Sequence, residues 1–244
     1  MNSKRLSLLI PLLLSMPLFA DINYVTNGDF ETGATNGTLS PTIPGDLIYV
    51  FGVGGATDIG GWTVSDSSNN NGSATPLSVL VTGNPPQVPA SGSYAVDFDP
   101  FWDIATGALL SGPVTGTLPE ISQSFLLPAG SYVLSFDGAV EEPDSPPGSR
   151  PLTVTLSGAA TLNQTVTASE SDDVGYTLFS FNFVSTGGSV DLTFTPNDYS
   201  PEPNFMLDNV SVIAAPDPSY GLPMMLALLG VVVLRSAFGP RRNS

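Results

Sequence analysis

Hydrophobic residues at every second position dominate the middle of this chain, and this alternation limits the folds that it can adopt. Such runs occur at Ile121–Leu127, Tyr132–Phe136, Leu152–Leu156, Phe179–Phe183 and Val190–Phe194. Because side chains on a strand point to alternate faces, the runs predict strands with one buried face. Pro128-Ala129-Gly130 and Gly187-Gly188 are predicted to be turns between them. No helical period of useful length appears before Tyr220, so the pattern predicts an all-β antiparallel β-sandwich.

The C-terminal end combines a polar motif, an apolar run and basic residues. Pro216, Asp217, Pro218 and Ser219 precede an apolar stretch that begins at Leu222, and the basic residues that follow are Arg235, Arg241 and Arg242. Residues 220–238 approach the roughly 20 residues that a transmembrane helix needs. Arg235 is near the end of this stretch, where its side chain can reach the interface. We therefore expect one transmembrane helix at 220–238 and a basic cytoplasmic end at 241–244. The alternative is a helix buried in the folded domain, which the charged flanks do not favour.

The N-terminal end has the pattern of a secretory signal peptide. Lys4 and Arg5 precede the apolar stretch Leu6–Phe19, and Ala20 stands before Asp21 at the expected cleavage point. We therefore expect a signal peptide at 1–20, a β-sandwich domain at 21–213 and a sorting tail at 214–244. The export machinery would then place the body outside the inner membrane.

The tail resembles the PEP-CTERM signal of Gram-negative bacteria, which the processing enzyme exosortase recognises. The resemblance rests on Pro216, Pro218, the apolar run and the terminal arginines, with Asp217 where the family has glutamate. It implies an exosortase substrate that passes through an inner-membrane intermediate to the cell surface or extracellular matrix.

The body between the two ends is strongly acidic. All 22 acidic residues lie between Asp21 and Asp217, and Arg150 is the one basic residue in that interval, so its formal charge is −21. Such a surface repels phosphates, which excludes nucleic acid as a partner. It also repels itself, which implies bound divalent cations or high ambient salt. The alternative is that most of these acids only solvate the surface.

The chain contains neither cysteine nor histidine. This composition excludes disulfides, Ser-His-Asp and Cys-His nucleophile systems and conventional zinc sites. A glycoside hydrolase would need two carboxylates, which the acidic groups at 97–103 or 141–144 could supply. Acids in proline-rich and turn-rich sequence are more typical of solvated loops. We therefore expect no enzymatic activity.

Short motifs follow one another along the body. They are Asn27–Gly33, Gly61–Val64, Gly92–Asp97, Ile121–Gln123, Pro128–Tyr132 and Leu207–Val212. In this order they resemble galactose-binding-like jelly-roll domains, most closely a cell-wall family of unknown function shared by plants and PEP-CTERM bacteria. Carbohydrate-binding modules are more distant relatives. The resemblance implies a jelly roll, and insertions before Trp62 and after Asp99 set this chain apart.

The resemblance also implies a structural calcium ion. Related modules hold calcium at the positions of Glu31 and Asp208, and Asp29 is a third candidate ligand. The first and last strands of a jelly roll lie close together, so Glu31 and Asp208 can converge. Calcium takes six to eight oxygen ligands. The alternative is that Asp29 organises a turn and Asp208 accepts backbone hydrogen bonds.

Two aromatic positions are candidates for stacking on sugar rings. Trp62 lies in an alternating run, which favours a place in the core. Phe101 and Trp102 stand between Asp99 and Asp103 in a long polar stretch, so they are the better candidates for glycan contact. The alternative is that Trp102 only pins this loop to the domain.

These observations predict an exported, non-catalytic surface or matrix protein that associates with exopolysaccharide or another cell-surface glycan. The alternative is a structural matrix or adhesion protein with no specific glycan ligand. A carboxylate-dependent glycoside hydrolase is the least favoured reading.

Overall fold

This computed structural model describes residues 22–33, 38–39, 48–51, 58–65, 67–68, 74–75, 77–81, 89–98, 102–103, 108–109, 120–140, 149–169, 175–197 and 205–216. The chain divides into two compact units, Met1–Ala214 and Ala215–Ser244. No helix within the described ranges has the length and apolar character needed to cross a membrane. The predicted signal peptide with Ala20 and Asp21, and the tail from Asp217 onward, lie outside the described residues.

All regular structure in the described residues is β-strand, which confirms the all-β prediction. The five longest strands are β11 Glu120–Val140, β12 Ser149–Ala160, β13 Leu162–Ser169, β14 Thr177–Pro196 and β15 Phe205–Ala214. The shorter strands are β1 Thr38–Leu39, β2 Ile48–Phe51, β3 Asp58–Ile59, β4 Trp62–Ser65, β5 Ser67–Ser68, β6 Ala74–Thr75, β7 Leu77–Val81, β8 Tyr94–Asp97, β9 Trp102–Asp103 and β10 Ala108–Leu109.

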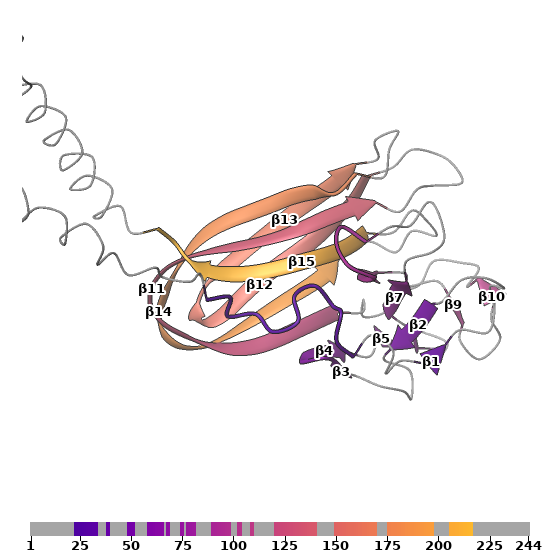
Figure 1. Ribbon diagram of the computed structural model, residues 1–244, viewed down its shortest axis with the longest axis horizontal. Coiled ribbons are helices and arrows are strands. Elements are labelled where there is room, and N and C mark those ends of the chain that lie inside the picture. Colours follow the sequence, from indigo (N-terminus) through magenta and orange to yellow (C-terminus); the bar gives the residue numbers. More distant parts are fainter. Residues whose placement is uncertain are drawn as a thin grey trace, which may run out of the picture. The chain divides into compact units, whose positions relative to one another are not determined.

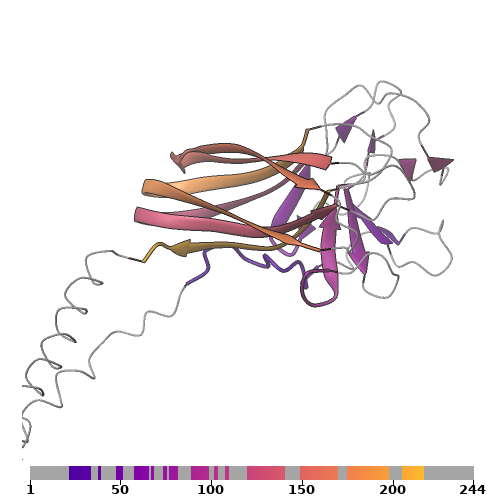
Figure 2. The ribbon, with the colours of Figure 1, turned by 90° about the horizontal axis from the view of Figure 1, so that it is seen from above.

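One curled antiparallel sheet contains most of these strands. Its main path runs β1-β2-β7-β8-β15-β11-β14-β12-β13, and β4 pairs with β11 on one side and β3 on the other. Two short ladders, β9 with β10 and β5 with β6, lie apart from it. The curl folds this sheet over itself, so the described part of the body has two layers with a core between them (Figures 1 and 2).

The two layers share β11 and β14. These strands stay paired from Ile121↔Phe194 to Gly138↔Thr177. The first half of β11 also pairs with β4, and the second half of β14 pairs with β12. The second half of β11 pairs with β15. Each of the two long strands therefore passes from one layer into the other at a common bend, seen at one end of the ribbon (Figure 1).

The two turns predicted between the hydrophobic runs are wrong. Pro128-Ala129-Gly130 and Gly187-Gly188 lie inside β11 and β14, and the pairs Leu127↔Gly188 and Gly130↔Ser185 flank the bend. Gly187 and Gly188 have φ values of 90° and 140°, which favour glycine. Proline at such a position gives up a ladder hydrogen bond. These residues therefore bend two paired strands together without reversing the chain.

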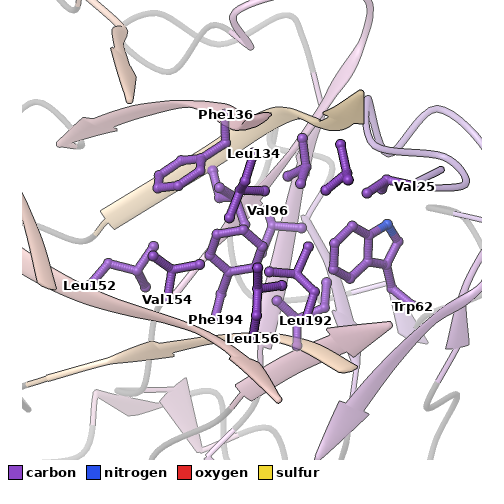
Figure 3. Packing of buried hydrophobic residues seen from close by; sticks show 14 of the residues in the cluster. Val25, Trp62, Val96, Leu134, Phe136, Leu152, Val154, Leu156, Leu192 and Phe194 are labelled. Atoms are coloured by element: carbon purple, nitrogen blue, oxygen red, sulfur yellow. The ribbon is translucent and has the colours of Figure 1, made fainter. Parts of the chain in front are cut away.

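The core fills the space between the layers. Phe136 and Phe194 meet edge-on with ring centroids 5.1 Å apart, and the rings of Trp62 and Phe194 are 6.1 Å apart. Leu134 and Leu192 are fully buried beside them (Figure 3). Trp62 has no exposed surface, which confirms its predicted place in the core.

The N-terminal segment 22–33 lies along β15. The amide of Tyr24 donates to the carbonyl of Val212 at 2.9 Å, and the amide of Val210 donates to the carbonyl of Gly28 at 2.8 Å. Asn23 adds a side-chain bond, because its Oδ1 accepts the amide of Val212 at 3.0 Å. The beginning and the end of the body are thus joined side by side.

Gln123 ties this segment to the rest of the sandwich. Its Oε1 accepts the amide of Thr26 at 2.7 Å, and its Nε2 donates to the carbonyls of Thr26 at 2.9 Å and Gly61 at 3.2 Å. The Gln123 side chain is 6% exposed, so water is a poor substitute for these bonds. The indole Nε1 of Trp62 donates to the carbonyl of Asn27 at 3.0 Å, which fixes the next residue.

We predict that Gln123→Ala lowers the free energy of unfolding by about 2–4 kcal/mol, because it removes three partly buried hydrogen bonds to backbone groups. Urea denaturation measures the change. Asn182→Ala on the exposed face of β14 is the control and should stay within about 0.5 kcal/mol of the parent. Equal stability of the two variants would contradict a tethering role for Gln123.

Candidate functional site

The loop at Asn27–Gly33 is closed by the side chain of its first residue. Asn27 has a positive φ of 50°, a conformation that asparagine adopts more readily than most residues. Its Oδ1 accepts the amide of Thr32 at 2.8 Å, and its Nδ2 donates to the carbonyls of Thr32 at 2.8 Å and Ile59 at 3.1 Å. These three hydrogen bonds fix the position of Glu31 within the loop.

Glu31 holds a second loop. Its Oε1 accepts the amides of Ser93 at 2.6 Å and Tyr94 at 2.9 Å. Gly92 in that loop has a φ of 63°, and a Cβ there would lie 2.2 Å from Glu31 Oε1. The close approach of the carboxylate therefore requires glycine at this position.

Asp208 holds the same loop from the last strand. Its Oδ2 accepts the amide of Ser91 at 3.0 Å, and its Oδ1 accepts the amide of Asn209 at 2.7 Å. The Asp208 side chain is fully buried. The structure thus brings Glu31 and Asp208 to one loop, residues 91–94, although they are distant in sequence.

Two further carboxylates lie around Asp208. Asp137 is its cross-strand partner on β11, and the Oδ2 of Asp137 accepts the Nδ2 of Asn209 at 2.9 Å. Asp97 on β8 is 3% exposed. The pKa of Asp208 is raised to about 6, because burial and, to a smaller extent, the charge of Asp137 outweigh the lowering effect of the amides of Ser91 and Asn209.

The same negative charges also affect Tyr176. Its burial raises its pKa well above the usual value, and the charges of Asp208, Asp97 and Asp137 add to this increase. This corner of the sandwich therefore concentrates carboxylates in a region of low solvent access. In the described ranges, no three acidic side chains are grouped closely enough to hold a metal ion.

Asp29 lies elsewhere, in a cleft of about 320 Å³. The cleft is lined by Asn23, Val25, Asn27, Gly28, Asp29, Asn209, Val210 and Ser211. It therefore lies between the N-terminal segment and β15. The side chain of Asp29 is exposed, and its carboxylate makes no hydrogen bond with any described residue. Of the three candidate calcium ligands, Glu31 and Asp208 contact the 91–94 loop, while Asp29 faces this cleft.

The remaining candidate residues are placed only in part. Trp102 belongs to β9 and is opposite Leu109 of β10, and the backbone alone is described there. Phe101 lies outside the described residues, as do Asp217, Pro218, Ser219, Arg235, Arg241 and Arg242. Pro216 is described and exposed, two residues after β15 ends.

Sequence reasoning missed the residues that build the site. Gln123 falls at an inward-facing position of the alternating run Ile121–Leu127, and a polar residue at such a position is the available signal that it bonds to backbone. Asn27 was recognised only as part of a motif. The hydrogen bonds of its side chain depend on an unusual backbone conformation, which the sequence alone does not show.

No family model matches the chain, and no curated protein matches it. Among solved structures, the chain is similar to the module TmCBM61 in complex with β-1,4-galactotriose, with 19% identity and a TM-score of 0.48 over 80% of this chain and 99% of that one. It is similar to a proposed sugar-binding protein from Bacteroides thetaiotaomicron, with 14% identity and a TM-score of 0.47 over 80% of this chain and 100% of that one.

It is also similar to the CBM22-1 xylan-binding domain of Xyn10C from Paenibacillus barcinonensis, with 15% identity and a TM-score of 0.38 over 71% of this chain and 97% of that one. At these identities and TM-scores, the likenesses carry no conclusion about the ligand or the activity of this chain. The finer assignment to the galactose-binding-like jelly roll stays a prediction.

We predict that the difference in unfolding free energy between the parent and Asp208→Asn depends on pH. The folded pKa of Asp208, about 6, is above its ordinary value of 3.8, so folding favours the protonated form. Its contribution to stability is therefore greatest at low pH, declines between about pH 4 and 6, and is constant above that range. Urea midpoints measured in chelator across this range test the sign. A difference that grows with pH would show that the ionised carboxylate is the stabilised form.

Proposed function

We propose that this protein is an exported, non-catalytic surface or matrix protein whose β-sandwich associates with exopolysaccharide. The observation that carries the proposal is the polar cleft between the N-terminal segment and β15. Its volume is within the range of small-molecule sites. It offers hydrogen-bonding groups without any basic side chain, so it suits neutral hydroxyl groups better than anions.

The cleft has groups that remain available to a ligand. The carboxylate of Asp29 can accept hydrogen bonds from hydroxyls, since it is exposed and makes none to described residues. Asn23 uses its Oδ1 to bind the amides of Val25 and Val212, and no hydrogen bond occupies its Nδ2 within the described ranges. An acceptor and a donor side by side match the hydroxyl pairs of a sugar ring. The formal charge of −21 on the body also favours a neutral glycan over an acidic one.

The carboxylates support a non-catalytic role. A glycoside hydrolase needs a carboxylic acid of raised pKa that reaches the glycosidic oxygen. Asp208 has a raised pKa, but it is fully buried and its oxygens accept two backbone amides. It therefore cannot reach a polysaccharide without loss of the 91–94 loop.

A structural matrix or adhesion protein without a specific glycan is the second candidate. It is favoured by the internal hydrogen bonds of the cleft, because the amides of Asn27 and Asn209 are already engaged by the protein itself. Phe101 and Trp102 remain proposed stacking residues in the glycan-binding version.

The sorting tail remains part of the proposal. Export by the signal peptide and processing by exosortase explain the two ends of the sequence. The exposed position of Pro216, two residues beyond β15, supports access by a processing enzyme. The motif Pro216-Asp217-Pro218-Ser219 is the proposed recognition element, and Arg235, Arg241 and Arg242 are the proposed cytoplasmic anchor.

We expect Asp29→Ala to weaken binding to a neutral polysaccharide by about 10- to 100-fold, the loss expected for a hydrogen bond to a charged group. A glycan array would identify the polysaccharide, and calorimetry would measure Kd. Asp191→Ala removes an exposed carboxylate on β14, outside the cleft, and should leave Kd unchanged. Loss of binding in Trp102→Ala but not in Asp29→Ala would place the glycan-binding site at β9 and not in the cleft. If the protein binds neither neutral nor acidic glycans on the array, the structural alternative is favoured.

A structural calcium ion at Glu31 and Asp208, beside the 91–94 loop, is also part of the proposal, whereas Asp29, the third candidate ligand, faces the cleft. The support is electrostatic, because Asp97, Asp137 and Asp208 crowd negative charge into a buried corner. A divalent cation held by carboxylate oxygens there would offset that repulsion. When bound, calcium would supply charge neutralisation and rigidity to the 91–94 loop, with no part in chemistry.

If calcium binds, its addition at about 100 times Kd should stabilise the fold by about 2.7 kcal/mol. The melting temperature would then rise by about 5–10 °C for a domain of this size. Differential scanning calorimetry after chelation, with calcium or magnesium added back, measures the shift. Asp208→Asn should lose the calcium response, whereas Asp191→Asn should keep it. A melting temperature that does not change when calcium is added would overturn the proposed calcium site.

A further inference from the structure

The outer surface of the common bend in β11 and β14 is uncharged and exposes several apolar side chains. We call residues 126–131 and 184–189 the bend surface. Leu126 is 74% exposed and Val184 is 66% exposed, and Pro128 and Ala129 are exposed between them. Leu126 and Val184 are two of the four exposed large hydrophobic side chains in the described residues, the others being Ile22 and Leu178.

The bend surface contains no acidic residue, whereas several of the described carboxylates lie toward the other end of the strands. Because β11 passes through both layers, its two ends, Glu120 and Val140, both lie away from the bend (Figure 1). Asp97, Asp137 and Asp208 occupy the same half, and Asp191 is the acid closest in sequence to the bend surface. In the described residues, the buried carboxylates of Asp97 and Asp208 therefore lie away from the bend, and the bend surface itself is uncharged.

The chain enters and leaves the described body next to the bend surface. Ala214, the last residue of β15, is opposite Tyr132, just after the bend. Ile22, 65% exposed, begins the described N-terminal segment, and the nearby Tyr24 bonds to Val212. Seven residues, 215–221, separate Ala214 from the first residue of the apolar run, Leu222. Seven extended residues span at most about 25 Å.

We infer that the bend surface rests on the lipid bilayer while the protein is anchored by its tail. The inference depends on the proposed transmembrane role of residues 220–238. A short connection holds this end of the sandwich near the membrane, and its uncharged surface can approach the headgroups without desolvating a carboxylate. The acidic end is repelled by anionic lipids, so repulsion turns it toward the aqueous side. Leu126 and Val184 then contact the interface of the bilayer.

The chain has no cysteine, so single-cysteine variants can report this orientation directly. Leu126→Cys and Val184→Cys place an environment-sensitive fluorophore on the bend surface. Leu178→Cys is the matched control, because Leu178 is 67% exposed on the same strand and face as Val184 and lies about 20 Å along it. All three variants of the full chain are reconstituted in vesicles of phosphatidylcholine and phosphatidylglycerol. Quenching is measured with a lipid-borne nitroxide and with aqueous iodide.

We expect at least twofold stronger nitroxide quenching at positions 126 and 184 than at position 178, with the reverse order for iodide. Equal quenching at all three positions in protein that floats with the vesicles overturns the inference and leaves the proposed anchor intact. Protein that fails to float with vesicles overturns both. Protection from iodide without nitroxide quenching marks a second copy of the chain on this surface and overturns the lipid assignment.

A charge variant tests the physical cause. Ser131→Glu adds a carboxylate to the exposed bend surface, and Ser180→Glu adds one to an exposed position farther along β14. The first should reduce nitroxide quenching at position 184 at least twofold in anionic vesicles, and the second should leave it unchanged. An identical response to the two substitutions contradicts a lipid contact at the bend.

Discussion

The unbroken pairing of β11 with β14 is the constraint on which the rest of this structure depends. Since the two strands bend together, one ladder supplies the middle of both layers, and the neighbouring strands only extend it on either side. The core is then closed by side chains that alternate inward along the same two strands, such as Phe136 and Phe194. A break in this ladder would separate the layers, and the packing of these rings would be lost with it.

The candidate site depends on a second set of interactions, in which side-chain amides and carboxylates bind backbone. Gln123 and Asn27 fix the N-terminal segment, and Glu31 and Asp208 then fix the 91–94 loop. These bonds come from strands and loops far apart in sequence. The cleft beside Asp29 exists because the segment is held against β15 at two backbone positions.

Much of the fold could be predicted from the sequence, because the period-two runs in β11, β12 and β14 record which face is buried. The burial of Trp62 followed from the same pattern. The bend could not be predicted, since Pro128 and Gly187-Gly188 are equally compatible with a chain reversal, and only strand pairing distinguishes the two. The meeting of Glu31 and Asp208 at one loop could be anticipated from motif order. The separation of Asp29 from them could not, because adjacent residues in a tight loop point in directions set by backbone dihedrals.

The 91–94 loop has a consequence for the timing of folding. One of its anchors lies 62 residues before Ser93, and the other lies 117 residues after Ser91, in the last strand of the body. Contacts of such long range form late, because the chain must first close large loops. An emerging polypeptide thus cannot complete this corner until Asp208 is available. A chain threaded outward from its N-terminus would stay incompletely folded during most of its transit, which suits passage through a narrow translocation channel.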